Sequence, residues 1–323
     1  MIVLVFTGGT ISMRHDAVAG GAIPSLRGRD ILDLSPGIDR IADLEIDDWG
    51  GHPGPHMTVD RMWALRQRLL EHLARSDVDG IVVTHGTDSL EESAYLVARS
   101  ISTEKPVVFT GAMRTSSELG WDGPGNLGAA VRVAASPASR GHGVIVVMSD
   151  RVYSALDVTK VHTSMLDAFD SPGLGPLGVV DDGSVIFRRA LAADVATLAP
   201  GSLGVPVDIV YAWAGADSRL LNASQATARG VVVAAMGRGN VPPEMLAGID
   251  AFIAAEKPVV ITSRAARGRV GPTYGYPGGG RRLLERGAIL GGTRRPQQAR
   301  IDLMLALGLG LSVQQIRGVF DGP

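Results

Sequence analysis

The sequence predicts an α/β protein with two domains: a larger N-terminal domain, in which helices flank a mainly parallel sheet, and a smaller C-terminal α/β domain. Short apolar runs alternate along the chain with segments of helical period. This alternation is typical of βαβ units, with parallel strands and right-handed crossovers. The chain has 323 residues, which is long for one hydrophobic core and favours two domains.

The expected strands are short, continuous apolar runs, as in the buried strands of a parallel sheet. In chain order, these runs are residues 2–6, 81–83, 107–109, 144–148, 209–211, 231–233 and 259–261. The expected helices lie between the runs, where apolar residues recur with the helical period. They are residues 59–73, 90–100, 127–135 and 242–256.

The domain boundary is expected near residue 200. Residues 171–182 are rich in glycine and proline, and a short strand at 185–189 closes the first set of elements. The prediction is therefore an N-terminal domain at 1–190 that carries the candidate chemistry, a linker at 191–206 and a C-terminal domain at 207–323.

Composition excludes several functional classes. With 45% hydrophobic and 20% charged residues and a net charge of −2, the chain gives no electrostatic reason to expect nucleic acid or membrane as a partner. There is no cysteine, which excludes disulfides, thiolate nucleophiles and cysteine-bound metals. No stretch approaches the roughly 20 apolar residues of a membrane span. The first strand begins at Ile2 and leaves no room for a signal peptide, so a cytoplasmic protein is expected if Met1 is the native start.

Two threonine-bearing turns follow apolar runs, and both are expected at the carboxyl edge of the sheet, where open α/β sheets bind ligands. They are Thr7-Gly8-Gly9-Thr10-Ile11 and Thr84-His85-Gly86-Thr87-Asp88-Ser89. Thr10 is a candidate nucleophile that needs a neighbouring base, and Gly8-Gly9 would free backbone N–H groups for an oxyanion. The alternative is that Thr10 merely caps the segment that follows.

Asp88 and Lys160 are the charged candidates. Asp88 either caps the following helix or binds a substrate ammonium group. Only three of the 31 basic residues are lysine, at positions 105, 160 and 257. Lysine can lose its proton in a protein and arginine cannot, so Lys160 in Asp157-Val158-Thr159-Lys160 suggests proton transfer. The alternative is a structural lysine that caps buried carbonyls, and Lys105 and Lys257 need no other role.

Other motifs carry less chemistry. Asp122-Gly123-Pro124-Gly125-Asn126 is typical of a turn and a helix start. His52 and His56 are separated by two prolines, so no helix presents both to a zinc ion. No Gly-x-Gly-x-x-Gly follows the first strand, which argues against dinucleotide binding. Residues 13–29 have little periodicity and fit either a mobile lid or a plain surface loop.

Taken together, these motifs resemble the bacterial-type L-asparaginase family of amidohydrolases over nearly the whole chain. The matching segments are Thr7-Gly8-Gly9-Thr10-Ile11, His85-Gly86-Thr87-Asp88-Ser89, Thr110-Gly111-Ala112-Met113, Asp122-Gly123-Pro124, Asp157-Val158-Thr159-Lys160, Ala168-Phe169 with Ser171-Pro172, and Gly175-Pro176-Leu177-Gly178. Several separate motifs in the family's order make a chance match improbable.

The resemblance implies hydrolysis of a side-chain amide, foremost L-asparagine to L-aspartate and ammonia, without metal or cofactor. Thr10 would attack the amide carbon and form an acyl-enzyme. Thr87 and Lys160 would form a second threonine centre, in which Lys160 eases deprotonation of a hydroxyl or a water. Asp88 would hold the α-ammonium group, and backbone N–H groups near Thr87 and Ala112 would stabilise the oxyanion. The family is typically a homotetramer built from close dimers, with active sites between subunits.

Three positions depart from the family pattern. Ala22 stands where the family commonly has a lid tyrosine. Gly54, followed by Pro55, stands where a serine usually binds the substrate carboxylate. Arg238, in Gly237-Arg238-Gly239-Asn240, takes the place of an asparagine near the amino group, where a cation disfavours an ammonium and favours an anion. The candidate substrate-binding residues are Gly54, Pro55, Thr87, Asp88, Ala112 and Arg238.

These departures leave three hypotheses. The first is an asparaginase in which Tyr274, Tyr276 or another residue replaces the lid tyrosine. Some family members have a glutamate from the partner subunit in the segment that corresponds to these two tyrosines, and this sequence has no clear match for it. The second is the same mechanism acting on another small amide. The third is a non-catalytic binding or regulatory protein that keeps the fold. Ammonia release across a panel of small amides separates the three.

Overall fold

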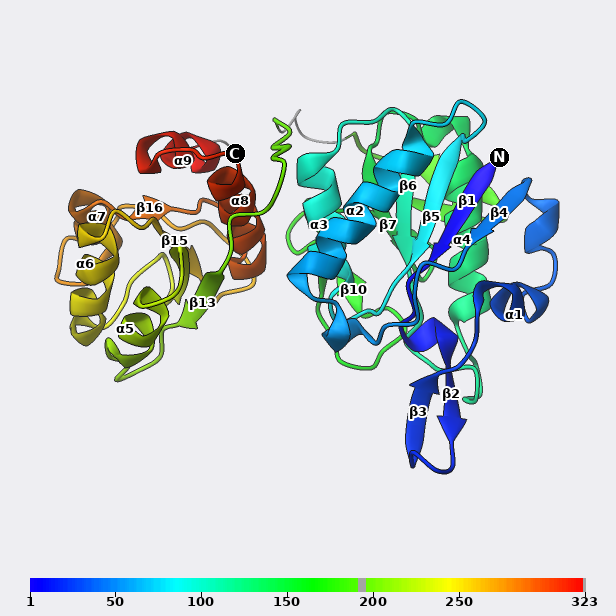
Figure 1. The fold of residues 1–323 in the computed structure, drawn as a ribbon, viewed down its shortest axis with the longest axis horizontal. Helices are drawn as coiled ribbons and strands as arrows, with labels where there is room; N and C mark the ends of the chain where they lie inside the picture. The colour runs from blue at the N-terminus through cyan, green and yellow to red at the C-terminus, as the bar shows by residue number, and fades with distance from the viewer. Residues whose placement is uncertain (191–195, 322–323) are drawn as a thin grey trace. The chain divides into compact units, whose positions relative to one another are not determined.

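The computed structural model describes residues 1–190 and 196–321. It divides into two compact units, Met1–Thr197 and Leu198–Pro323, which are described one at a time (Figure 1). Part of the predicted linker, residues 191–195, lies outside the described residues. In the described part of the chain, no helix combines the length and the apolar character needed to span a membrane.

An eight-stranded sheet forms the centre of the first unit. The strands from β7 to β4 run parallel to one another, and the sheet continues beyond β7 with antiparallel neighbours. In spatial order, the strands are β12 (Ser184–Phe187), β11 (Gly178–Asp181), β8 (Arg151–Ser154), β7 (Val144–Met148), β6 (Val107–Thr110), β5 (Gly80–Thr84), β1 (Ile2–Phe6) and β4 (Leu44–Asp47).

Helices cover both faces of this sheet, which is why its central strands are apolar on both sides. In Figure 1, α2 (Val59–Leu73) and α3 (Leu90–Ser100) lie in front of the sheet and α4 (Gly123–Ala135) lies behind it. The two faces form separate apolar clusters. Val83 packs with the α2 and α3 side, and Val82 packs with the α4 side, which also takes in α1 (Gly28–Asp33).

A two-stranded hairpin follows the first turn and extends from the end of the unit (Figure 1). It consists of β2 (Met13–Asp16) and β3 (Gly21–Pro24), paired so that His15 lies opposite Ala22. The Ser116 N–H and hydroxyl both bind the carbonyl oxygen of Met13, at 3.1 and 2.9 Å, and so attach the hairpin to the loop after β6. The segment predicted as a lid or plain loop is therefore a paired hairpin that leads into α1.

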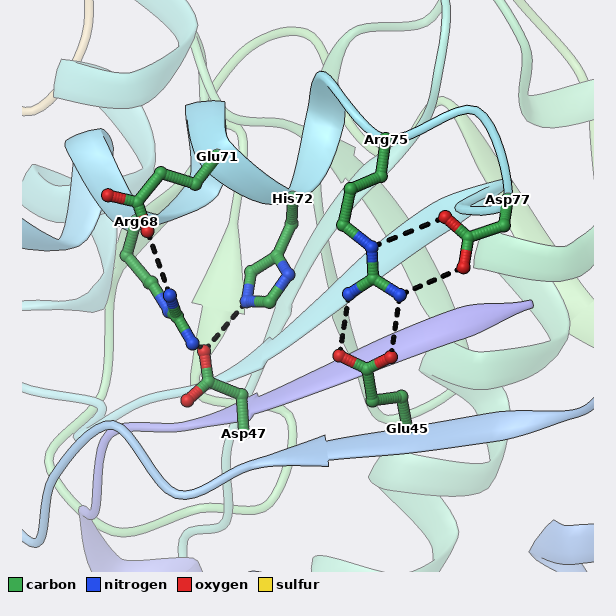
Figure 2. Close-up of polar contacts among 7 residues, drawn as sticks. All are labelled: Glu45, Asp47, Arg68, Glu71, His72, Arg75 and Asp77. Carbon is green, nitrogen blue, oxygen red and sulfur yellow. Dashed lines mark hydrogen bonds and ion pairs between the residues drawn. The ribbon is translucent and has the colours of Figure 1, made fainter.

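The edge strand β4 is attached to α2 by a cluster of charged side chains (Figure 2). Asp47 accepts hydrogen bonds from Arg68 Nε and His72 Nε2, each at 2.7 Å. Glu45 accepts two bonds from Arg75, at 2.7 and 2.8 Å, and Arg75 also binds Asp77. Figure 2 shows that the contacts run side by side between the helix and the strand, so each acidic residue of β4 has a basic partner on the α2 side.

The second unit contains a smaller sheet of four parallel strands. Their spatial order is β13 (Val207–Tyr211), β14 (Gly230–Ala235), β15 (Val259–Ser263) and β16 (Ile289–Leu290). One face packs against three short helices: α5 (Arg219–Gln225), α6 (Leu246–Ala254) and α7 (Gly280–Arg286). Helix α8 (Pro296–Gly308) contacts β13, β14 and β15, and α9 (Val313–Phe320) packs on α8.

These two α/β units, with the larger mainly parallel sheet first, confirm the predicted fold class. Helices α2 and α3 have the predicted bounds. Helix α4 begins at Gly123 rather than at residue 127, because the Asp122-Gly123-Pro124 turn is continuous with the helix. The predicted helix at 242–256 is a 3-10 turn at Pro243–Met245 followed by α6, in keeping with the two prolines at its start.

Candidate active site

Three loops of the first unit meet through glycine backbones. Gly9 follows β1, Gly86 follows β5, and Gly54 lies after β4. A Cβ atom on Gly9 would lie 2.5 Å from Gly86 Cα, and a Cβ atom on Gly86 would collide with Gly54 Cα. Side chains at Gly9 and Gly86 would therefore push the loops apart. Because Thr10 and Thr87 directly follow these two glycines, the contact places both threonines at one edge of the sheet.

The loop after β6 packs against the same place. A Cβ atom on Gly111 would lie 2.6 Å from the His85 carbonyl oxygen and 3.3 Å from Thr87 Cγ2, so the buried Ala112 lies next to the Thr87 turn. Asp122 accepts bonds from the Met113 and Arg114 N–H groups, with shortest distances of 2.9 Å.

Asn126 completes this support. Its amide donates to the Gly111 carbonyl oxygen and to Asp122, both at 3.0 Å. The motif at 122–126, interpreted from sequence as a turn and helix start, therefore also holds the Ala112 loop in place.

Lys160 contacts the second threonine turn directly. Its Nζ donates to Thr87 Oγ1 at 2.9 Å and forms an ion pair with Asp88 Oδ1 at 2.7 Å. Lys160 belongs to β9 (Thr159–Lys160), which pairs with β10 (Phe169–Asp170), and its N–H donates to Glu91 Oε2 at 2.6 Å. The Lys160 side chain is 17% exposed and that of Asp88 is 59% exposed. The amine is thus mostly enclosed, while the carboxylate remains open to solvent.

The other two lysines have a different environment. Lys105 Nζ donates to the carbonyl oxygens of Leu73 and Arg75, at 2.9 and 2.6 Å, near the C-terminus of α2. Lys257 Nζ donates to the carbonyl oxygen of Gln225, the last residue of α5. Both act as structural lysines at helix ends. The amine of Lys160, in contrast, contacts a hydroxyl and a carboxylate.

Neither Thr10 nor Asp88 acts as a helix cap. Thr10 is the half-buried first residue of the 3-10 turn Thr10–Ser12, and the capping position belongs to Gly9. The capping position of α3 belongs to Ser89, whose hydroxyl donates to the Gly54 carbonyl oxygen at 2.7 Å. That bond joins the Thr87 turn to the Gly54 loop.

Gly54 and Pro55 border this turn from the β4 side. Gly54 is buried and begins the 3-10 turn Gly54–His56, and Pro55 is exposed. A Cβ atom on Gly54 would lie 3.3 Å from Asp88 Cβ, a tight contact. A side chain at Gly54 would therefore crowd the turn that bears Asp88.

His85 lies beneath the turn and is completely buried. Its Nδ1 is 2.9 Å from the Gly86 carbonyl oxygen, which can only accept, so Nδ1 carries the proton. Burial lowers the pKa of His85 to about 4, so the ring is neutral at pH 7. Sequence reasoning noted His85 only as a motif residue, because nothing in its spacing reveals its burial.

Arg238, Tyr274 and Tyr276 belong to the second unit. Arg238 lies in the turn after β14, between two glycines of positive φ, and a Cβ atom on Gly271 would lie 2.9 Å from its Nη2. The rings of Tyr274 and Tyr276 have centroids 5.5 Å apart and are exposed. Among residues 1–190 and 196–321, no three His, Asp or Glu side chains form a group that could hold a metal ion.

A hydroxyl, an amine and a carboxylate thus meet at the carboxyl edge of a mostly parallel sheet, the organisation of an α/β enzyme that acts on a small molecule. Comparison with known proteins defines the class further. Residues 1–193 match the N-terminal asparaginase family, and residues 206–320 match the glutaminase/asparaginase C-terminal domain family.

Individual relatives match over nearly their whole length. A probable L-asparaginase of Deinococcus radiodurans is 39% identical, covering 99% of this chain and 96% of that protein. An L-asparaginase of Bacillus licheniformis is 35% identical, covering 95% of each. The crystal structure of a probable cytoplasmic L-asparaginase from Campylobacter jejuni superimposes with a TM-score of 0.89 at 30% identity, covering 100% of this chain and 99% of that one. The chain belongs to the asparaginase family of amidohydrolases, as its motifs predict.

Proposed function

We propose that this enzyme hydrolyses the side-chain amide of L-asparagine to L-aspartate and ammonia through an acyl-enzyme on Thr10. The observation that carries the proposal is the contact of Lys160 Nζ with Thr87 Oγ1 and Asp88 Oδ1, at 2.9 and 2.7 Å. It supplies a basic group, a hydroxyl and a carboxylate beside the turn that bears Thr10.

Thr10 is the proposed nucleophile. Its Oγ attacks the amide carbon, the C–N bond breaks, and the amine leaves as ammonia after it has gained a proton. Water then hydrolyses the threonine ester, releases aspartate and restores the hydroxyl. Backbone N–H groups near Thr87 and Ala112 are the proposed donors to the oxyanion, and the bonds from Asp122 and Asn126 hold the Ala112 loop for that task.

Lys160 is the proposed proton carrier of the second threonine centre. In the free enzyme, its ammonium donates to Thr87 and is paired with Asp88. A substrate α-ammonium bound to Asp88 would share this carboxylate with Lys160. In its neutral form, the Lys160 amine would accept a proton from Thr87 or from water.

The same mechanism on a different small amide is the second candidate. Gly54 offers no hydroxyl for a substrate carboxylate, and Arg238 brings a cation where the family commonly has a neutral asparagine. The arginine favours a substrate that carries an additional anionic group. The glycine removes a donor to the carboxylate of asparagine, which weakens the case for asparagine as the substrate. In either case Thr10, Thr87 and Lys160 keep the roles given above.

The test is ammonia release from asparagine, glutamine and other small amides. We expect Thr10→Ala to abolish turnover and Lys160→Arg to lower kcat at least 100-fold, because arginine keeps the charge and cannot deprotonate. Lys105→Arg is the matched control, since Lys105 binds carbonyl oxygens only, and it should keep kcat. Turnover that survives Thr10→Ala, or equal kcat in Lys160→Arg and wild type, would refute the assignment.

Assembly and location are also proposed from the family. A homotetramer built as a dimer of dimers is expected, and light scattering in solution should give four times the mass of the 33.7 kDa chain. A cytoplasmic location remains a prediction, for which fractionation of the native cells is the test. Recovery of the enzyme outside the cytoplasmic fraction would contradict it.

A further inference from the structure

The second unit has a net positive charge, whereas the first unit has a net negative charge. Residues 198–323 contain 14 Lys and Arg against 8 Asp and Glu, a net charge of +6. Residues 1–197 contain 17 against 25, a net charge of −8. Between Glu256 and Glu285, the chain has six basic residues and no acidic one. Although the net charge of the whole chain is close to zero, the second unit therefore contains a strongly cationic region.

Four arginines of this region lie on two loops at the carboxyl edge of the four-stranded sheet. Arg238 is on the loop 236–240 after β14, and Arg264, Arg267 and Arg269 are on the loop 264–271 after β15. We call these two segments the arginine loops. In the described part of the chain, none of the four side chains forms an ion pair with Asp or Glu, and all four are exposed.

Hydrogen bonds hold the arginine loops together. The Gly271 N–H donates to the Arg238 carbonyl oxygen at 3.0 Å, and the Arg264 N–H donates to Ala235 at 2.9 Å. Ser263 Oγ donates to the Gly237 carbonyl oxygen at 2.7 Å. The four arginines therefore lie on adjoining loops whose backbones are hydrogen-bonded to each other.

Two of these guanidinium groups lie against other segments of the second unit. Arg238 Nη2 lies so close to Gly271 that a Cβ atom there would approach it to 2.9 Å, and Gly271 has no positive φ that would itself call for glycine. Arg264 Nη1 donates to the Ala212 carbonyl oxygen at 3.1 Å. The fold thus gathers four arginines on adjoining loops without an acidic partner among the described residues, an arrangement that a bound anion would stabilise.

We propose that the arginine loops form a binding site for a small polyanion with two or more carboxylate or phosphate groups. The guanidinium fork matches both groups with paired hydrogen bonds. The site lies where parallel α/β sheets bind their ligands, outside the carboxyl ends of the strands. The site shares Arg238 with the candidate substrate-binding residues, but binding of the polyanion requires neither an amide nor Thr10.

The test is titration calorimetry of the full-length enzyme with citrate and with inorganic phosphate, which separates carboxylate from phosphate recognition. Arg238→Gln combined with Arg269→Gln should raise the Kd at least tenfold, and added salt should weaken wild-type binding. Arg229→Gln is the matched control, because this exposed arginine precedes β14 at the opposite edge of the same sheet. It should keep the wild-type Kd within twofold.

Binding of either anion that is weakened in the double variant supports the site. The anion that binds shows whether the site recognises carboxylate or phosphate groups. Equal Kd values in the double variant and in wild type would overturn it, as would the absence of binding for both anions. If the double variant changes only the sedimentation of the enzyme, the loops pair with an acidic surface of a second copy, and the small-anion proposal is wrong. Because the experiment measures anion binding and not turnover, its outcome does not depend on whether the enzyme hydrolyses asparagine.

Discussion

At the residue scale, His85 makes the stability of this enzyme depend on pH. The ring is fully buried and burial lowers its pKa to about 4, against 6.5 in an unfolded chain. As the pH falls below 6.5, the unfolded chain takes up a proton that the folded ring does not accept until about pH 4. Stability from this residue is therefore present at neutral pH and lost between those two values.

We expect this loss to amount to about 2 kcal/mol of unfolding free energy between pH 8 and pH 5. His85→Phe and His85→Asn should each remove this part of the pH dependence, whatever they do to stability at pH 8. Urea unfolding at several pH values measures the slopes. Slopes equal to that of wild type in both variants would show that His85 is not the cause.

The glycine contacts at the three loops allow a second residue-scale prediction. Gly86→Ala should cost about 1–3 kcal/mol by overpacking and should also displace Thr87, because the added methyl collides with the Gly54 backbone. Gly125→Ala is the control: its methyl meets nothing within 4 Å, and it lies in α4. Thermal melts and kcat measure both effects. A Gly86→Ala enzyme with wild-type activity would contradict the close approach of the loops.

The sequence pointed to candidate catalytic residues more readily than to the residues that contact them. Thr10, Thr87, Asp88 and Lys160 were proposed because hydroxyls, a carboxylate and a rare lysine followed apolar runs in a family order. Glu91, which binds the Lys160 N–H, was missed because the two residues are 69 positions apart. Asp122 was taken as part of a turn, since its bonds to the Ala112 loop depend on the fold.

At the element scale, the edge strand β4 is stabilised by charge rather than by burial. Burial raises the pKa of the Asp47 carboxyl, but hydrogen bonds from Arg68 and His72 outweigh it and hold the pKa below its usual value of 3.8. Asp47 is 13% exposed, whereas Glu71, the other partner of Arg68, is 65% exposed. The same arginine therefore forms one enclosed pair and one open pair.

This difference predicts unequal costs. Asp47→Asn should lower the unfolding free energy by about 2 kcal/mol at pH 7, because it leaves the buried His72 and the half-exposed Arg68 without their charged acceptor. Glu71→Gln should cost less than about 0.5 kcal/mol, as for an exposed ion pair. The Asp47→Asn deficit should shrink as the pH falls below 3.8, because there the carboxyl of the unfolded wild-type chain takes up a proton before that of the folded enzyme does. Equal costs for the two variants would contradict this account.

Strand β4 also shows why some elements were not predicted from the sequence. Strands β1 and β5 are fully buried and are marked by unbroken apolar runs. Every residue of β4 is only half-buried, and Leu44-Glu45-Ile46-Asp47 alternates apolar with acidic residues. Pattern reasoning based on continuous runs therefore found the centre of the sheet and missed its edge, along with β8 and β11.

At the scale of the whole molecule, length and alternation predicted two α/β units, and two are found. Fold and family establish an amidohydrolase, whereas the chemical step rests on the two threonine turns. Thr10 and Thr87 lie at the same edge of one sheet, and both carry hydroxyls. The central claim is that the acyl group is carried by Thr10 and that Thr87 serves with Lys160.

Acid quenching of the enzyme during turnover of asparagine, followed by peptide mass spectrometry, tests this claim most directly. The N-terminal tryptic peptide ends at Arg14 and contains Thr10, while Thr87 lies in a separate peptide. The account predicts an aspartyl adduct on Thr10 in wild type and in Thr87→Val, and none in Thr10→Ala. An adduct on Thr87, or steady turnover in Thr10→Ala, would contradict it.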